Sequence, residues 1–261
     1  MCGVLLALDL GNTNVTLGLF DGERLLHTFR AETVHARTAD EYAIVLRQMF
    51  LFSNVDVKSI TAAVMASVVP PLTDVLAEAT HHAFGVLPLI IGPGTKTGIS
   101  VRYDNPHEVG ADRVVNAAAA FDKVRGGAIV VDFGTATTFD CISPKGEYLG
   151  GVIAPGIRVS LEALLGRAAK LRPVEIAAPP TVLGRNSAHS MQSGIVHGYA
   201  SLVDGLVAKL KAELGFPCAV LATGGLAPLI AQHTQSIESV DPELTLVGLR
   251  LIHQRNKTAR D

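Results

Sequence analysis

The chain reads Leu5-Leu6-Ala7-Leu8-Asp9-Leu10-Gly11-Asn12-Thr13-Asn14 near its start, and near its middle it reads Ala128-Ile129-Val130-Val131-Asp132-Phe133-Gly134-Thr135-Ala136-Thr137. Each segment is an apolar run followed by Asp-x-Gly and then by small hydroxyl or amide residues. Such a run is typical of a buried strand, and Asp-x-Gly is typical of the turn that ends it. One such turn is common by chance. Two in one chain indicate a duplicated unit whose turns bind the phosphates of one nucleotide.

Each of these segments leads into a second strand, at residues 15–20 and 138–142, so each half of the chain opens with a hairpin. Helical and strand patterns alternate after each hairpin. We therefore expect an α/β fold of two lobes, related by pseudo-twofold duplication, with a cleft between them. The Gly- and Pro-rich residues 92–106 are the expected connection, which gives lobes of residues 1–105 and 106–261, although the end of the chain can return to the first lobe. The patterns predict helices at 39–50, after Pro70-Pro71, and at 114–121, 190–214 and 243–253, and strands at 60–66, 87–91 and 219–222.

Composition favours small-molecule chemistry. The 261 residues are 48% hydrophobic and carry a net charge of −2, with no cluster of Lys and Arg that would bind nucleic acid or a membrane surface. The three cysteines, Cys2, Cys141 and Cys218, are widely spaced, which argues against a disulfide framework and a zinc site. The first apolar run is too short for a signal peptide or a membrane span. We expect a cytoplasmic protein.

The first turn has the composition of a phosphate-binding loop. Gly11 lets the backbone approach an anion, and the residues up to Asn14 supply N–H and hydroxyl donors. Asp9 at the strand end could hold the water shell of a Mg²⁺ ion that bridges phosphates. The alternative is an ordinary tight hairpin in which Asp9 caps backbone amides.

The second turn places Asp132 and Thr135 at matching positions, which predicts a second phosphate or cation site. Gly224-Gly225 follows an expected strand and would allow a close approach to a ribose or a flat ring. This pair alone is a weak signal, because Gly-Gly after a strand is more often an ordinary strand-to-helix turn.

A further candidate is Asp112, at the start of the helical segment that follows Gly110. It could simply cap the helix or complement its dipole, or it could accept a proton from a substrate hydroxyl. Arg113 beside it could neutralise a phosphoryl or carboxylate group. The pattern leaves both readings open. The sequence contains no Gly-x-x-x-x-Gly-Lys-Ser/Thr loop, no Gly-x-Ser-x-Gly elbow and no His-x-x-x-His pair.

Six motifs in this order resemble type III pantothenate kinase, a family of the acetate and sugar kinase, Hsp70 and actin superfamily. The resemblance runs from the N-terminus to residues 249–252, and the six together are highly specific. The motifs are Asp9-Leu10-Gly11-Asn12-Thr13, Ser67-Val68-Val69-Pro70, Tyr103-Asp104-Asn105-Pro106, Gly110-Ala111-Asp112-Arg113, Asp132-Phe133-Gly134-Thr135-Ala136-Thr137 and Gly150-Gly151-Val152-Ile153-Ala154-Pro155-Gly156.

The resemblance implies a homodimeric enzyme with two ribonuclease-H-like lobes, which transfers a phosphoryl group from ATP to the primary hydroxyl of pantothenate, the first step towards coenzyme A. Asp112 would be the general base, Asp9 would hold Mg²⁺ through water, and Asp132 would bind a monovalent cation, K⁺ or NH₄⁺. Ser187 would complete the substrate site, where the family usually has Thr. The ATP-binding residues would be Asp9, Leu10, Gly11, Asn12, Thr13, Asn14, Val15, Thr16 and Thr135, with Gly224 and Gly225 as the candidates noted above. The substrate-binding residues would be Tyr103, Gly110, Ala111, Asp112, Arg113 and Ser187.

Two other functions compete with this one. Another kinase of the superfamily, acting on a sugar or a small carboxylate, would share the phosphate-binding turns. A regulatory accessory protein would bind ligands without turnover, but the intact Asp9, Asp112 and Asp132 argue against it, and the missing basic patch argues against direct DNA contact.

Overall fold

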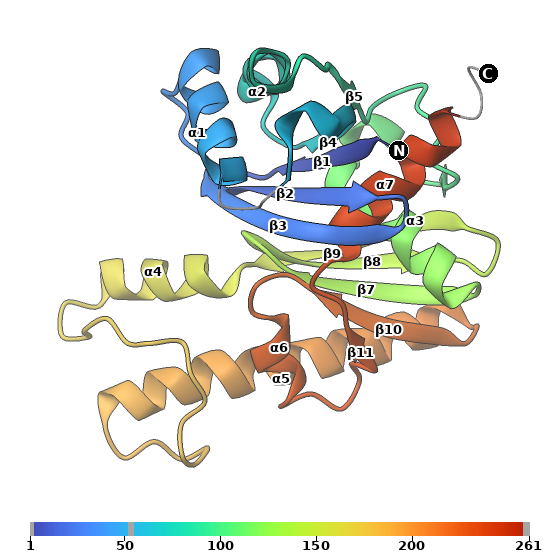
Figure 1. Cartoon of the computed structure of the whole chain (residues 1–261). Coiled ribbons are helices and arrows are strands. Elements are labelled where there is room, and N and C mark those ends of the chain that lie inside the picture. Colours follow the sequence, from blue (N-terminus) through green and yellow to red (C-terminus); the bar gives the residue numbers. More distant parts are fainter. Residues whose placement is uncertain (1–2, 52–54, 258–261) are drawn as a thin grey trace. The chain divides into compact units, whose positions relative to one another are not determined.

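A computed structural model of the chain describes residues 3–51 and 55–257 (Figure 1). Its described residues divide into two compact units. The first unit comprises residues of Met1–Ile99, Asp104–Ala119 and Thr245–Asp261, and the second comprises Ser100–Tyr103 and Ala120–Leu244. The lobes expected from the sequence, residues 1–105 and 106–261, remain a prediction.

The first unit contains a five-stranded sheet in the order β3-β2-β1-β4-β5. Strand β2 is antiparallel to both β1 and β3, while β4 and β5 run parallel to β1. The hairpin expected at the start of the chain is therefore confirmed. The strands are β1 (Val4–Leu10), β2 (Asn14–Asp21), β3 (Arg24–Glu32), β4 (Ile60–Ser67) and β5 (Pro88–Ile90).

Helices cover both faces of this sheet. Successive side chains of a strand point to opposite faces, so Leu6 and Leu8 of β1 pack with α1 and α2, whereas Leu5 and Ala7 pack with α3 and α7. Figure 1 shows α1 and α2 next to each other on their side of the sheet. By the same alternation Asp9 belongs to the face of α3 and α7. The helices are α1 (Ala39–Leu51), α2 (Pro70–Phe84), α3 (Ala111–Val124) and α7 (Leu244–Lys257), with short 3-10 turns at Val57–Ser59 and Pro106–Glu108.

The second unit contains a six-stranded sheet in the order β11-β10-β7-β8-β9-β6. Its first five strands, read from β9 to β11, repeat β3-β2-β1-β4-β5 position for position and in the same relative directions. The expected α/β duplication of ribonuclease-H type is thus confirmed in the topology of both sheets. Strand β6 is an addition that runs parallel to β9. The strands are β6 (Ser100–Val101), β7 (Gly127–Phe133), β8 (Ala136–Ile142), β9 (Glu147–Pro155), β10 (Cys218–Thr223) and β11 (Ser239–Val240).

Three helices pack on one face of the second sheet, where Ile129, Val131 and Phe139 meet residues of α4, α5 and α6 in a common core. In Figure 1, α4 and the first half of the long α5 project together from this sheet. The helices are α4 (Ile157–Arg167), α5 (Ser187–Leu214) and α6 (Ala227–Ala231).

The predicted elements are confirmed within a few residues, while β3, β6, β9, β11, α4 and α6 were not expected. Three boundaries differ by about a helical turn: α3 continues to Val124 rather than ending at residue 121, α5 begins at Ser187 rather than at residue 190, and α7 continues to Lys257 rather than ending near residue 253. Both Cys141 and Cys218 are buried free thiols, whereas Cys2 lies outside the described residues. Within the described ranges, no helix combines the length and the apolar character needed to cross a membrane.

Candidate active site

Backbone and side-chain hydrogen bonds fix the first turn, from Gly11 to Thr13. The Gly11 N–H donates to the carbonyl oxygen of Asn14 at 3.0 Å. Thr33, which follows β3, donates its N–H to the carbonyl oxygen of Thr13 at 2.9 Å and its hydroxyl to that of Gly11 at 2.7 Å. Thr33 is buried, whereas Asn12, Thr13 and Asn14 are exposed. The turn is therefore held rigid while its amide and hydroxyl side chains remain accessible to a ligand.

The other residues predicted to bind ATP in this region differ in what they can offer. Leu10 and Val15 are each 1% exposed, so only their backbone could contact a nucleotide. Thr16 and Asp9 are half-buried and are paired across β1 and β2. Among the residues of β1 and β2 that are predicted to bind ATP, Asp9 is the one carboxylate, and it lies near the end of β1 where the turn begins.

The start of α3 lies at the same end of the first sheet. A Cβ atom on Gly110 would be 3.4 Å from Cγ1 of Val68, and the Val68 N–H donates to the carbonyl oxygen of Leu10 at 3.1 Å. Gly110 therefore connects the helix start, through Val68, with the last residue of β1. Because Asp9 belongs to the sheet face that α3 covers, Asp9 and Asp112 lie on one face at one end of this unit.

Asp112 occupies the first turn of α3, and its Oδ1 accepts the N–H of Arg113 at 2.8 Å. The same N–H also donates to the carbonyl oxygen of Gly110 at 3.1 Å, so the Asp112 side chain shares an amide of the helix start. Burial raises the pKa of the Asp112 carboxyl, and the hydrogen bond and the positive charge of Arg113 oppose that rise. The cap reading from the sequence is thus correct for one oxygen. A carboxylate with a raised pKa is also a stronger base than an ordinary aspartate.

Glycines surround the second turn, between β7 and β8. A Cβ atom on Gly224, whose φ is +91°, would lie 2.6 Å from the carbonyl oxygen of Phe133 and 2.7 Å from Oδ1 of Asp132. A Cβ atom on Gly156 would lie 2.0 Å from the carbonyl oxygen of Thr135. Only glycine allows these approaches. The strand ends at Gly156 and Gly224 therefore bring their backbones directly against the turn that carries Asp132 and Thr135.

Tyr103 belongs to the second unit, where it lies against β9. Its ring centroid is 6.3 Å from that of Tyr148, with the ring planes tilted by 57°. A Cβ atom on Gly150 would be 3.5 Å from the Tyr103 ring. Tyr103 is half-buried, so one part of its ring remains available to a ligand.

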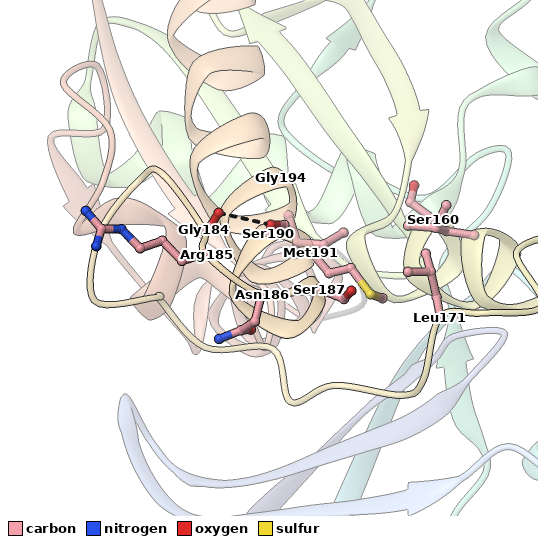
Figure 2. Close-up of a pocket in the computed structure, with 11 residues that line it drawn as sticks. Ser160, Leu171, Gly184, Arg185, Asn186, Ser187, Ser190, Met191 and Gly194 are labelled. Carbon is pink, nitrogen blue, oxygen red and sulfur yellow. Dashed lines mark hydrogen bonds between the residues drawn. The ribbon is translucent and has the colours of Figure 1, made fainter.

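Ser187 is the first residue of α5 and lines a pocket of about 720 Å³ between α4 and α5. Figure 2 shows Ser187 and Met191 on the side of α5 that faces Ser160 and Leu171. Asn186 caps the helix by accepting the His189 N–H at 2.8 Å. The complete lining is Ser160, Leu164, Leu171, Gly184, Arg185, Asn186, Ser187, Ser190, Met191, Gly194 and Ile195.

The structure thus brings the predicted residues together in groups. Asp9, the first turn and Asp112 form one group in the first unit, and Asp132, Thr135 and Gly224 form one in the second. Within the described part of the chain, the pocket at Ser187 contains none of the other predicted residues. No set of three His, Cys, Asp or Glu side chains suited to a metal ion occurs among the described residues.

Sequence reasoning missed two residues that shape these groups. Thr33 holds the first turn although it lies 22 residues from Gly11 in the sequence, and no local pattern marks it. Gly156 packs on the second turn, and its place at the end of the Gly150–Gly156 motif could have suggested a structural role.

Comparison with known proteins gives a consistent result. A profile of the family described as type III pantothenate kinase matches residues 5–209. The type III pantothenate kinase of Myxococcus xanthus is 56% identical over 253 residues, covering 97% of this chain and 99% of that protein. The protein of the same name from Geobacter sulfurreducens is 51% identical, covering 97% and 100%.

Solved structures share the fold at low sequence identity. A Campylobacter jejuni protein assigned to the Baf family of transcriptional activators has a TM-score of 0.61 at 18% identity, covering 97% of this chain and 99% of that one. The ROK hexokinase of Thermus thermophilus has a TM-score of 0.53 at 16% identity, covering 98% and 99%. These likenesses establish a fold that sugar kinases also use, in agreement with the two duplicated sheets. The match along nearly the whole length of close relatives goes further and confirms the resemblance seen in the motifs: the chain belongs to the type III pantothenate kinase family.

Proposed function

We propose that this protein transfers the γ-phosphoryl group of ATP to the primary hydroxyl of pantothenate, the first step of coenzyme A synthesis. The observation that carries the proposal, beyond family membership, is Asp112: a carboxylate of raised pKa at a helix start, on the sheet face and at the sheet end where the first turn begins. The buried free thiols of Cys141 and Cys218 are compatible with a cytoplasmic location.

The first turn would bind the phosphates of ATP. The exposed Asn12, Thr13 and Asn14 offer amide and hydroxyl donors, and Gly11 keeps the backbone close to the ligand. Asp9 fits a Mg²⁺ ion held through water, because Mg²⁺ keeps several of its waters and needs few protein carboxylates. When bound, Mg²⁺ would neutralise charge on the phosphates.

Asp112 would act as the general base. The pantothenate hydroxyl oxygen forms a bond to the γ-phosphorus, the bond from that phosphorus to the β–γ bridging oxygen breaks, and ADP leaves. The hydroxyl proton passes to the Asp112 carboxylate. The hydrogen bond from the Arg113 N–H fixes the carboxylate, so that the substrate meets a base already in position.

The second turn would hold a monovalent cation and contact ATP through Thr135. Its donor set is suitable, because the Asp132 carboxylate and the Phe133 carbonyl oxygen both face the close approach of Gly224, and oxygen ligands suit K⁺ as well as NH₄⁺. Gly224 and Gly225 would allow the nucleoside to approach the backbone.

Pantothenate would be bound by Tyr103, by residues 110–113 and by Ser187. Ser187 keeps the hydroxyl of the Thr usual in the family but lacks its methyl group. We also propose a homodimer formed through α4 and the segment that precedes α5, because large apolar side chains are exposed there: Leu164 is 43%, Val182 66% and Leu183 74% exposed.

The decisive experiment is a coupled assay of ADP release with pantothenate as acceptor, in K⁺ and in Na⁺. We expect release that depends on pantothenate and is faster in K⁺. Parallel reactions with glucose test the sugar kinase alternative. Release with glucose and none with pantothenate would refute the proposed substrate, and the absence of release with any acceptor would favour an accessory protein that only binds ligands.

A further inference from the structure

Asp140 is a buried carboxylate that the proposed chemistry does not use. It lies in β8 and has no exposed surface. The Tyr148 hydroxyl donates to its Oδ1 at 2.8 Å, and the Thr138 hydroxyl donates to its Oδ2 at 3.3 Å. A carboxylate is tolerated in the interior only where such bonds replace its lost hydration. We therefore take the role of Asp140 to be structural: its hydrogen bonds fix the Tyr148 and Thr138 side chains.

A β-bulge brings Tyr148 to Asp140. Asp140 pairs with Gly151 and Cys141 with Gly150, but Ile142 pairs with Tyr148, so β9 has one extra residue at this point. In unbroken register Tyr148 would pair with the residue after Ile142 and point to the opposite face. The bulge instead places Tyr148 on the face of Ile142 and Asp140, within diagonal reach of the carboxylate.

Besides its bond to Asp140, Tyr148 contacts the segment that carries Tyr103. The short strand β6 adds to the edge of β9, with Val101 paired to Tyr148, and the Arg102 N–H donates to the Tyr148 carbonyl oxygen at 2.8 Å. Tyr103 follows directly, and its ring lies 6.3 Å from that of Tyr148, within the range of favourable aromatic pairs. Gly150, with a φ of +122°, lets the Tyr103 ring lie close to the backbone of β9.

We propose that Tyr148, oriented by Asp140, is a positioning residue that fixes the ring of Tyr103 for binding of pantothenate. The inference rests on the proposed function, in which Tyr103 binds the substrate. The hydrogen bond to Asp140 fixes the Tyr148 ring, and that ring then limits the orientations open to Tyr103. The contribution is pre-organisation, so it belongs to substrate binding rather than to phosphoryl transfer.

The test begins with Tyr148→Phe, which keeps the ring and removes the hydroxyl. We expect the KM for pantothenate to rise about three- to tenfold, because one buried hydrogen bond is lost. The kcat and the KM for ATP should change less than about twofold. In a Tyr103→Ala background the same change should alter the KM for pantothenate less than about twofold, because the residue through which it acts is gone. Equal increases in both backgrounds would overturn the proposal, as would an unchanged KM in the first.

Two variants of Asp140 test the same link with Tyr148 intact. Asp140→Asn keeps an oxygen that can accept the Tyr148 hydroxyl, whereas Asp140→Leu has a similar shape and no acceptor. We expect the Asn variant to keep the KM for pantothenate of the unaltered protein. The Leu variant should show the same raised KM as Tyr148→Phe. A higher KM in the Asn variant than in the Leu variant would contradict the inference.

Tyr42→Phe is the matched control. Tyr42 is 2% exposed, and its hydroxyl exchanges hydrogen bonds with the backbone of Val34 at 2.9 and 3.1 Å. Losing this hydroxyl should leave the KM for pantothenate unchanged, and a rise equal to that of Tyr148→Phe would overturn the inference. If the unaltered protein releases no ADP with pantothenate, the proposed function fails. If it does but Tyr148→Phe has no effect, only the present inference fails.

Discussion

Replacing Asp112 with asparagine separates the two roles that this side chain combines. Asn has the same shape, and its Oδ1 can still accept the N–H of Arg113, now 2.8 Å from the carboxylate. A neutral acceptor makes a weaker bond, which costs up to about 1 kcal/mol. Burial opposes this cost. Because burial raises the pKa of Asp112 in the folded protein, its favourable contribution to stability is complete below the pKa of the unfolded chain and is lost as the pH rises through the folded pKa.

At neutral pH the ionised Asp112 therefore lowers the stability of the fold, and the Asn variant avoids that penalty. We expect its melting temperature at pH 7 to equal or exceed that of the unaltered protein, and the difference to move against the variant towards pH 4. Thermal unfolding followed by circular dichroism at both pH values measures this. A variant that melts far lower at pH 7 would show that the carboxylate stabilises the helix start.

Turnover should respond in the opposite direction. Loss of a general base lowers kcat by roughly 10²- to 10⁴-fold, while the KM for pantothenate should change little. As the pH falls, kcat/KM of the unaltered enzyme should decline when Asp112 becomes protonated. Because the pKa of Asp112 is raised, this decline should begin at a higher pH than it would with an ordinary aspartate. The Asn variant should lack the decline. Asp122→Asn on the same helix is the matched control, since Asp122 pairs with Arg125 on the surface and should leave turnover intact. Turnover of Asp112→Asn within tenfold of the unaltered rate would refute the base assignment.

Three further outcomes follow from the two turns. Gly224→Ala places a methyl group 2.6 Å from the Phe133 carbonyl oxygen at a φ of +91°, so it should destabilise the fold by about 1–3 kcal/mol and raise the KM for ATP; an unchanged melting temperature and KM would contradict this. Asp132→Asn should fold normally but respond equally to K⁺ and Na⁺ in the ADP assay, and a retained preference for K⁺ would exclude it as the cation ligand. Thr33→Val removes the hydroxyl bond to Gly11, which should cost about 0.5–1.5 kcal/mol and raise the KM for ATP but not for pantothenate; equal effects on both would argue against a local role in the turn.

The parts of the fold that could be predicted are those with a strong apolar signal. Strands β1 and β7 are buried almost throughout, and a continuous apolar run is legible in a sequence. Strand β3 has only exposed and half-buried positions, and β6 and β11 have two residues each, so tertiary pairing rather than local pattern forms them. Helix α4 has only two fully buried side chains, Ile157 and Leu161, too few to give a clear period.

The residues of the proposed site that the sequence suggests are those where chemistry and local pattern coincide, namely Asp9, Asp112 and Asp132, and their roles stay predictions. The site was not predictable where one residue acts through register. Gly150 and Gly151 are a local sign of a bulge in β9, but they do not show that the extra residue moves Tyr148 to the face of Asp140. Hydrogen bonds between residues far apart in the chain also leave no local signal in the sequence, as the bond from Thr33 to Gly11 shows.

The two turns differ in the residues that pack against them, and this difference fits the proposal that the two units bind different ligands. In the first unit the hydroxyl and N–H of Thr33 donate to carbonyl oxygens of the turn. The groups left exposed are mainly the donor side chains of residues 12–14, which favour an anion. In the second unit Gly156 and Gly224 bring bare backbone against the turn, beside the carboxylate of Asp132. Oxygen atoms then dominate around that carboxylate, which favours a cation. On the proposed function, the same strand order would support phosphate binding in one copy and charge compensation in the other.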